Sequence, residues 1–223
     1  MKLTSINKQA ALQYMGYHDE SVSESIKQLT EKCEHSLLKA VTVRYTYRFF
    51  DIQFQNDGIS VCGSKLILMG EDIKKHLKGC HKAVLMAATL GIGADKLIKQ
   101  LSVNNLTESF ITDALASAAI EQVCDEIEKE ISGKLENSYT TWRFSPGYGD
   151  FALTQQKDFL TVINAEKLTG LSLSEGGMLI PAKSVTAVIG VSKHPVTQKR
   201  RGCITCSMNE TCSFRKRGGH CEF

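Results

Sequence analysis

Apolar residues recur at helical intervals in several parts of the chain. A short first helix is predicted by four such positions: Ile6, Ala10, Leu12 and Met15. Residues 22–38 carry the same period and predict a second helix. Further along, residues 71–79 predict a short helix and residues 155–168 a longer one.

A second pattern, in which apolar and polar residues alternate, predicts β-strands. Residues 41–55 alternate with period two and are rich in β-branched and aromatic side chains, so we expect a long strand with one buried face. The turn-forming residues 56–58 lead into a partner strand that begins at Ile59. Two apolar runs, 82–91 and 184–192, predict strands in the core.

The clearest helix is predicted between Thr107, which is expected to cap it, and Gly133, which is expected to end it. Its apolar face is formed by eight residues at helical spacing: Phe110, Ile111, Ala114, Leu115, Ala118, Val123, Ile127 and Ile131. The glycine-rich residues 90–95 lack the lysine and spacing of a phosphate-binding loop, and they predict a tight turn from strand to helix.

Composition and charge exclude several classes of protein. The 223 residues suffice for one domain, expected over residues 1–197, followed by a cysteine-rich basic tail at 198–223. Much of the net charge of +3 lies near the C-terminus, so the overall balance indicates no nucleic-acid partner. No stretch is apolar enough for a signal peptide or a membrane span, and we expect a cytoplasmic protein. In that compartment the eight cysteines favour buried, reactive or metal-bound thiols over disulfides.

The motif most suggestive of function is RFSPGY, at residues 143–148. The guanidinium of Arg143 can hold a carboxylate through two hydrogen bonds, and Gly147 allows a ligand to approach the backbone. Tyr148 adds an aromatic ring and a hydroxyl donor. Together these groups suit an amino acid joined to a nucleoside, although the same letters also occur in an ordinary surface turn.

The residues after this motif carry a resemblance to a known family. RFSPGY is followed by a helix ending in EKLTG and then by LSLSEGGMLIPAKSVTAVIGVSKHP. This order resembles the activation domain of cobalamin-dependent methionine synthase, and the upstream segments ALQYMGY, AATLG and DALASAAIEQVCD resemble the stand-alone members of this group. Three later segments match the family's pattern: Leu173-Ser174-Glu175, Pro181 with Ser184-Val185, and His194-Pro195. The resemblance is specific from Trp142 to Pro195 and looser before it.

The resemblance implies an α+β fold in which helices flank a curved antiparallel sheet. It also implies a methyltransferase component that binds S-adenosylmethionine and supports the reductive methylation of cob(II)alamin. Six residues are the expected S-adenosylmethionine ligands: Arg143, Ser145, Pro146, Gly147, Tyr148 and Glu121. Ser117 is the alternative to Glu121 for the helix position. No general base is required, and no catalytic dyad or triad is evident.

The corrinoid is expected on a partner chain, a methionine synthase subunit, because no DxHxxG cobalt-ligand motif is present. A flavodoxin-like protein or another electron donor is a further expected partner. Two departures from the fused enzymes stand out. Gly149-Asp150 replaces a Pro-Ala-Cys-Pro-like stretch, and the cysteine tail replaces an aromatic ligand segment.

Four cysteines in the tail have spacings typical of metal ligands: Cys203, Cys206, Cys212 and Cys221. They predict either zinc or an iron–sulfur cluster, with His220 able to replace one ligand; the alternative is a reduced tail without metal. The other cysteines are expected to fill the core: Cys33, Cys62, Cys80 and Cys124. Four histidines show no ligand spacing, so solvated or structural roles are expected for them: His18, His35, His76 and His81.

Two other functions fit the same features. The chain could reactivate a different corrinoid methyltransferase protein through the same site, and only the partner's identity separates this function from the first. It could instead be a metal or redox adaptor without chemistry of its own, acting through the cysteine tail.

Overall fold

A computed structural model describes residues 1–17, 22–196 and 210 of the chain. The chain divides into two compact units. The first comprises Met1–Thr46, Ala87–Gly133 and Asn164–Val185. The second comprises Tyr47–Met86, Lys134–Ile163 and the described residues from Thr186 onward. The predicted boundary at residues 197 and 198 lies outside the described residues.

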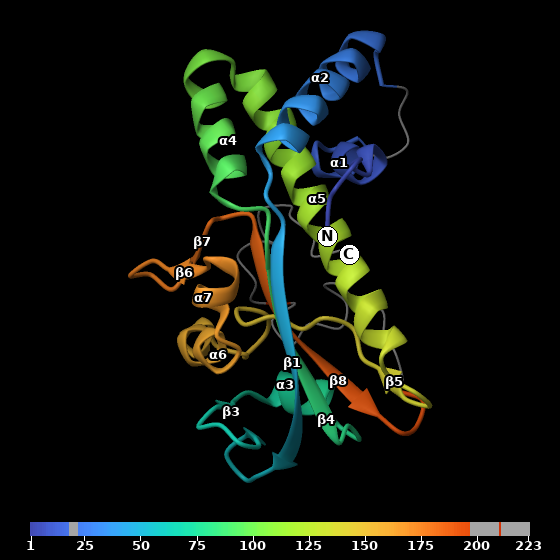
Figure 1. Ribbon diagram of the computed structural model, residues 1–223, viewed down its shortest axis with the longest axis vertical. Coiled ribbons are helices and arrows are strands. Elements are labelled where there is room, and N and C mark those ends of the chain that lie inside the picture. The colour runs from blue at the N-terminus through green and yellow to red at the C-terminus, as the bar shows by residue number, and fades with distance from the viewer. Residues whose placement is uncertain (18–21, 197–209, 211–223) are drawn as a thin grey trace. The chain divides into compact units, whose positions relative to one another are not determined.

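Four helices form the main body of the first unit: α1 (Lys8–Tyr14), α2 (Glu24–Ala40), α4 (Ile92–Asn104) and α5 (Leu106–Gly133). Helices α1, α2 and α4 all pack against α5 (Figure 1). Alanines on α5 are buried and allow this close approach. Helices α2 and α4 also meet closely, since a Cβ at Gly93 would lie only 2.1 Å from the carbonyl oxygen of Ala40. Gly93 is therefore required by packing.

The first unit also contains a short helix, α7 (Ala165–Thr169), and a hairpin formed by β6 (Ser172–Leu173) and β7 (Leu179–Ile180). The turn predicted at residues 90–95 is confirmed. It passes through Gly91, whose φ of +80° favours glycine, and leads directly into α4.

The main sheet has six strands in the order β3-β2-β1-β4-β8-β5 and is open. The strands are β1 (Arg44–Phe54), β2 (Ile59–Val61), β3 (Ile67–Leu68), β4 (Lys82–Thr89), β5 (Tyr139–Thr140) and β8 (Ser184–Ser192). The pairs β1–β2, β2–β3 and β5–β8 are antiparallel. Three further elements lie in the second unit: α3 (Glu71–His76), the 3-10 helix η1 (Leu153–Gln155) and α6 (Gln156–Val162).

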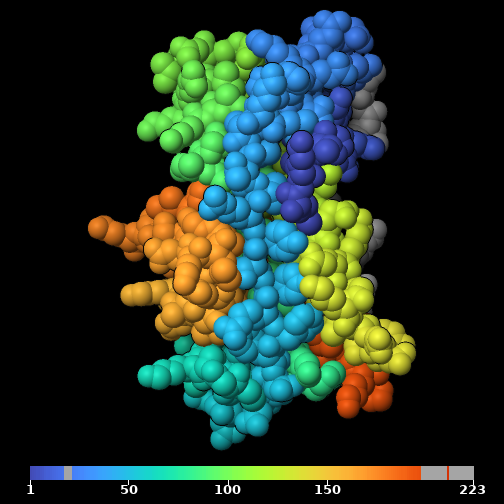
Figure 2. Space-filling model, viewed as in Figure 1, coloured from blue at the N-terminus to red at the C-terminus, as the bar shows by residue number. Residues whose placement is uncertain are grey.

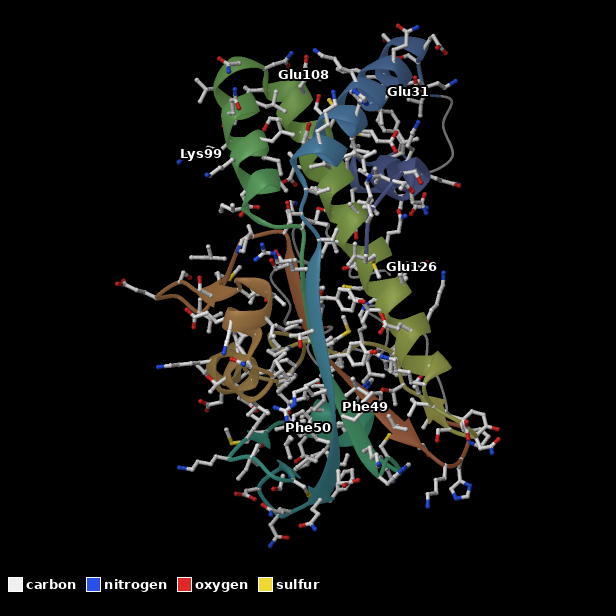
Figure 3. The ribbon with its side chains drawn as sticks, in the orientation of Figure 1. Glu31, Phe49, Phe50, Lys99, Glu108 and Glu126 are labelled. Atoms are coloured by element: carbon white, nitrogen blue, oxygen red, sulfur yellow. The ribbon has the colours of Figure 1, made fainter. Side chains whose placement is uncertain are left out.

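Strand β1 is largely solvent-exposed, and its atoms run along the face seen in Figure 2. Only Phe50 and Ile52 of this strand are buried. Phe49 and Phe50 project to opposite sides of β1, as expected for adjacent strand residues (Figure 3). The strands predicted at 41–55, 82–91 and 184–192 are present, and the α+β fold with its antiparallel sheet is confirmed, but the continuous buried face expected for the first of these strands is absent because only Phe50 and Ile52 are buried.

Three details of the helix predictions are wrong. Helix α5 begins at Leu106, and Asn105 caps it in place of Thr107, because the Asn105 side chain accepts a hydrogen bond from Glu108 N at 3.1 Å. Phe110 is 56% exposed and lies off the buried face of the helix. The helix predicted over 155–168 is broken at Asn164, whose φ of +54° is left-handed, a conformation that asparagine tolerates.

The described part of the chain contains no helix long and apolar enough to cross a membrane. Glu126, labelled in Figure 3, is exposed on α5 and forms an ion pair at 2.7 Å with the exposed Lys129.

Candidate functional site

The RFSPGY motif forms a tight turn in the second unit that is closed by backbone hydrogen bonds. Tyr148 N donates to Ser145 O at 3.2 Å, and Gly147 N donates to Phe151 O at 2.7 Å. Gly147 has a φ of +96°, which residues with a side chain rarely adopt. A compact turn with glycine at its tip results.

The residues of the turn differ in their exposure to solvent. Gly147 is exposed and Tyr148 is 42% exposed, whereas Pro146 is buried and fixes the turn from inside. Arg143 and Ser145 are half-buried. A guanidinium, exposed glycine backbone and a tyrosine ring thus occur within six consecutive residues, and these are groups able to bind a carboxylate and an adjoining polar group.

A β-bulge precedes the turn. Thr140 pairs with Val191, yet Phe144 pairs with Val188, so three residues on one strand (141–143) face two on β8 (189–190). Bulges of this kind redirect side chains at functional sites. Arg143 is one of the bulged residues.

Thr141 holds this bulge through two hydrogen bonds with one residue of β8. Its backbone N donates to Gly190 O at 2.9 Å, and its Oγ1 accepts from Gly190 N at 2.7 Å. Glycine suits this position, because a Cβ there would lie 2.5 Å from Cys80 Sγ and 2.8 Å from a methyl group of Leu77, and these buried side chains would have to shift.

Aromatic rings support the turn from inside the second unit. The ring of Phe144 stacks on Phe151 at 6.1 Å, so the residues at the two ends of the turn are in contact. Phe144 also stacks on His76, with 5.0 Å between ring centroids. His76 also meets Trp142 edge to face at 4.7 Å, and its Nε2 lies 2.8 Å from Thr141 Oγ1. The structural role expected for this histidine is therefore confirmed, though its place beside the turn was not foreseen.

Asp150 joins the end of the turn to helix α3. Its carboxylate accepts hydrogen bonds from Glu71 N at 2.7 Å and Asp72 N at 2.9 Å. The residue preceding α3 is Gly70, which provides no side-chain cap of its own. The neighbouring Gly149 approaches α3 so closely that a Cβ there would lie 2.1 Å from Asp72 Oδ2. The Gly149-Asp150 departure from the family pattern thus has a structural role in this chain.

The two candidates for the helix position both lie on α5, in the first unit. Glu121 lines an open depression of about 390 Å³ between α5 and the N-terminal segment, together with Ser5, Asn7 and Asp125. Ser117 instead receives a hydrogen bond from Lys183 Nζ at 2.9 Å.

Lys183 belongs to the family-like segment at 181–185 and ties it to the first unit. It also forms an ion pair with Asp113 at 2.9 Å, while the carboxylate of Asp95 accepts from Ala182 N at 2.6 Å. Ser184 Oγ donates to Pro181 O at 2.7 Å, which closes the turn itself. These contacts give the Pro-x-x-Ser-Val segment a structural role.

Three of the four cysteines expected in the core are buried: Cys33, Cys80 and Cys124. Cys62 is half-buried. Burial raises the pKa of the Cys80 thiol to about 11, so this thiol stays protonated at neutral pH. The four tail cysteines lie outside the described residues, and among the residues that are described no group of three or more His, Cys, Asp or Glu side chains is arranged to hold a metal ion.

Comparisons with known proteins agree with the fold. Residues 73–199 match the family described as the activation domain of vitamin B12 dependent methionine synthase. A solved structure described as the MetH reactivation domain bound to AdoHcy has a similar fold, with a TM-score of 0.67 and 15% sequence identity over 96% of this chain and 82% of that one. Curated protein sequences include no match. Because the family match spans more than half of the chain, the protein belongs to the family of vitamin B12 dependent methionine synthase activation domains.

Proposed function

We propose that this chain binds S-adenosylmethionine at the turn formed by residues 143–148 and supports the reductive methylation of cob(II)alamin carried by a separate methionine synthase subunit. The observation that carries the proposal is the turn itself, which lies inside the family match and combines Arg143, the exposed Gly147 and Tyr148. The similar solved domain was bound to AdoHcy, the demethylated form of the same ligand, which supports this choice of ligand.

Each residue of the turn has a proposed role. The Arg143 guanidinium holds the carboxylate of the methionine moiety, and the backbone of residues 145–147, including Pro146, meets polar edges of the ligand. Tyr148 orients the ligand through its ring and hydroxyl. Glu121 is the proposed acidic ligand from α5.

The reaction requires the protein to position S-adenosylmethionine and does not require a proton transfer. The sulfonium carbon–sulfur bond breaks with its electron pair left on sulfur, so no proton moves and no general base is needed. The corrinoid supplies the cobalt that accepts the methyl group, and a one-electron donor supplies the missing electron. This chain holds the ligand with its methyl group toward the partner.

The cysteine tail is proposed to bind a metal through Cys203, Cys206, Cys212 and Cys221. Zinc would serve as a structural clip, whereas an iron–sulfur cluster would also offer an electron-transfer route. A cytoplasmic location would keep these thiols reduced. The absorbance and metal content of the purified protein distinguish the two, since a cluster is brown and zinc is colourless.

The proposed activity is tested with methyl-labelled S-adenosylmethionine, a reductant and a cob(II)alamin-loaded methionine synthase subunit. We expect label in the corrinoid with the wild-type chain and a strong loss with Arg143→Ala. The exposed Arg44→Ala variant is the control and should retain activity. Transfer to another corrinoid protein but not to methionine synthase would support the alternative partner, and no transfer to either would contradict the proposal.

A further inference from the structure

We infer that His76 is a positioning residue for Arg143, an inference that rests on the proposed function. His76 is the last residue of α3 and is 9% exposed. It contacts three of the four residues from Thr141 to Phe144 and thereby brackets the arginine.

The bulge is the reason why Arg143 needs such support. An extra residue in one strand weakens the regular ladder of hydrogen bonds, so the direction of side chains in the bulge depends on other contacts. Here those contacts come from Thr141, whose Oγ1 accepts from Gly190 N at 2.7 Å and lies 2.8 Å from His76 Nε2. The imidazole thus fixes the hydroxyl that holds the bulge in register with β8.

The ring of His76 fixes the other side of the bulge. Trp142 meets it edge to face and Phe144 stacks on it, so the residues on both sides of Arg143 contact one imidazole. Arg143 lies between these two residues in the chain, so the backbone on both sides of it is held by one imidazole. A ring without the nitrogen would keep the stacking but lose the hold on Thr141.

His76→Phe tests this inference because phenylalanine preserves the stacked ring and removes the Nε2 contact. We expect it to weaken binding of S-adenosylhomocysteine about tenfold by calorimetry, because neighbouring residues of one network couple at this level. In an Arg143→Ala background, His76→Phe should weaken S-adenosylhomocysteine binding almost no further. Binding of 5′-methylthioadenosine, which lacks the carboxylate, should be unchanged. The exposed His35→Phe is the matched control.

A second pair of variants tests the contact between His76 and Thr141 by changing Thr141. Thr141→Val removes the hydroxyl and should weaken S-adenosylhomocysteine binding as His76→Phe does, while Thr141→Ser keeps the hydroxyl and should bind like the wild type. If His76→Phe fails to fold, the difference in affinity between Thr141→Val and Thr141→Ser tests the inference.

The outcomes separate this inference from the proposed function. Wild-type affinity in His76→Phe and Thr141→Val would overturn the inference alone. So would equal losses for both ligands, or a loss that adds fully to that of Arg143→Ala, because these would show general destabilisation. Failure of Arg143→Ala to weaken binding would overturn the proposed function and this inference with it.

Discussion

Replacing Asp150 with alanine should destabilise the second unit by about 1.5 kcal/mol. Its carboxylate is the acceptor for two backbone donors at the start of α3, Glu71 N at 2.7 Å and Asp72 N at 2.9 Å, and Gly70 offers no substitute. Loss of a helix cap costs about 0.5–2 kcal/mol, and the lost negative charge at a helix N-terminus adds a few tenths. The exposure of Asp150 keeps the total within that range.

The assay is urea denaturation, supported by thermal unfolding, where this loss corresponds to roughly 3–6 °C for a chain of this length. Asp150→Asn keeps one oxygen acceptor, so its free energy of unfolding should fall by about half as much as that of Asp150→Ala. Asp57→Ala, at an exposed turn position, is the control and should change stability by less than about 0.5 kcal/mol. If Asp150→Ala and Asp57→Ala were equally stable, the proposed anchoring of the turn to α3 would be wrong.

Two further predictions concern Gly149 and Cys80. Gly149→Ala should cost about 2–3 kcal/mol more in unfolding free energy than Gly63→Ala, since both have positive φ but only the new Cβ at Gly149 would strike Asp72 Oδ2; equal losses would contradict the packing described. The folded-state pKa of Cys80 lies above its usual value of 9.0, so its contribution to stability is complete below pH 9 and is lost as the pH rises toward about 11. Denaturation across this range should show a smaller decline in Cys80→Ala, and an identical decline would refute the raised pKa.

Local patterns in the sequence predict most of the regular elements. Helix α5 and strand β8 carry sustained apolar patterns, so β8 lies where the sequence places it and α5 differs mainly in its first turn. The break at Asn164 was missed because the helical apolar period continues across it, through Leu160, Ile163 and Leu168. Only the tolerance of asparagine for left-handed backbone hinted at that break.

The candidate site was predicted only where its residues are contiguous. Arg143 to Tyr148 form one motif, whereas Asp150 caps a helix 79 residues away in sequence and His76 meets Thr141 across 65 residues. No local pattern encodes such pairs. One signal was available for Asp150, because a helix that begins after glycine leaves backbone donors that need an acceptor from elsewhere.

Calorimetric titration of S-adenosylmethionine into the wild type, Arg143→Ala and Arg44→Ala measures whether the turn at residues 143–148 binds this ligand. We expect measurable binding by the wild type and by Arg44→Ala, with a loss of about 2 kcal/mol, roughly 30-fold in Kd, for Arg143→Ala. Equal affinity in all three proteins would contradict the assignment of this turn as the S-adenosylmethionine site.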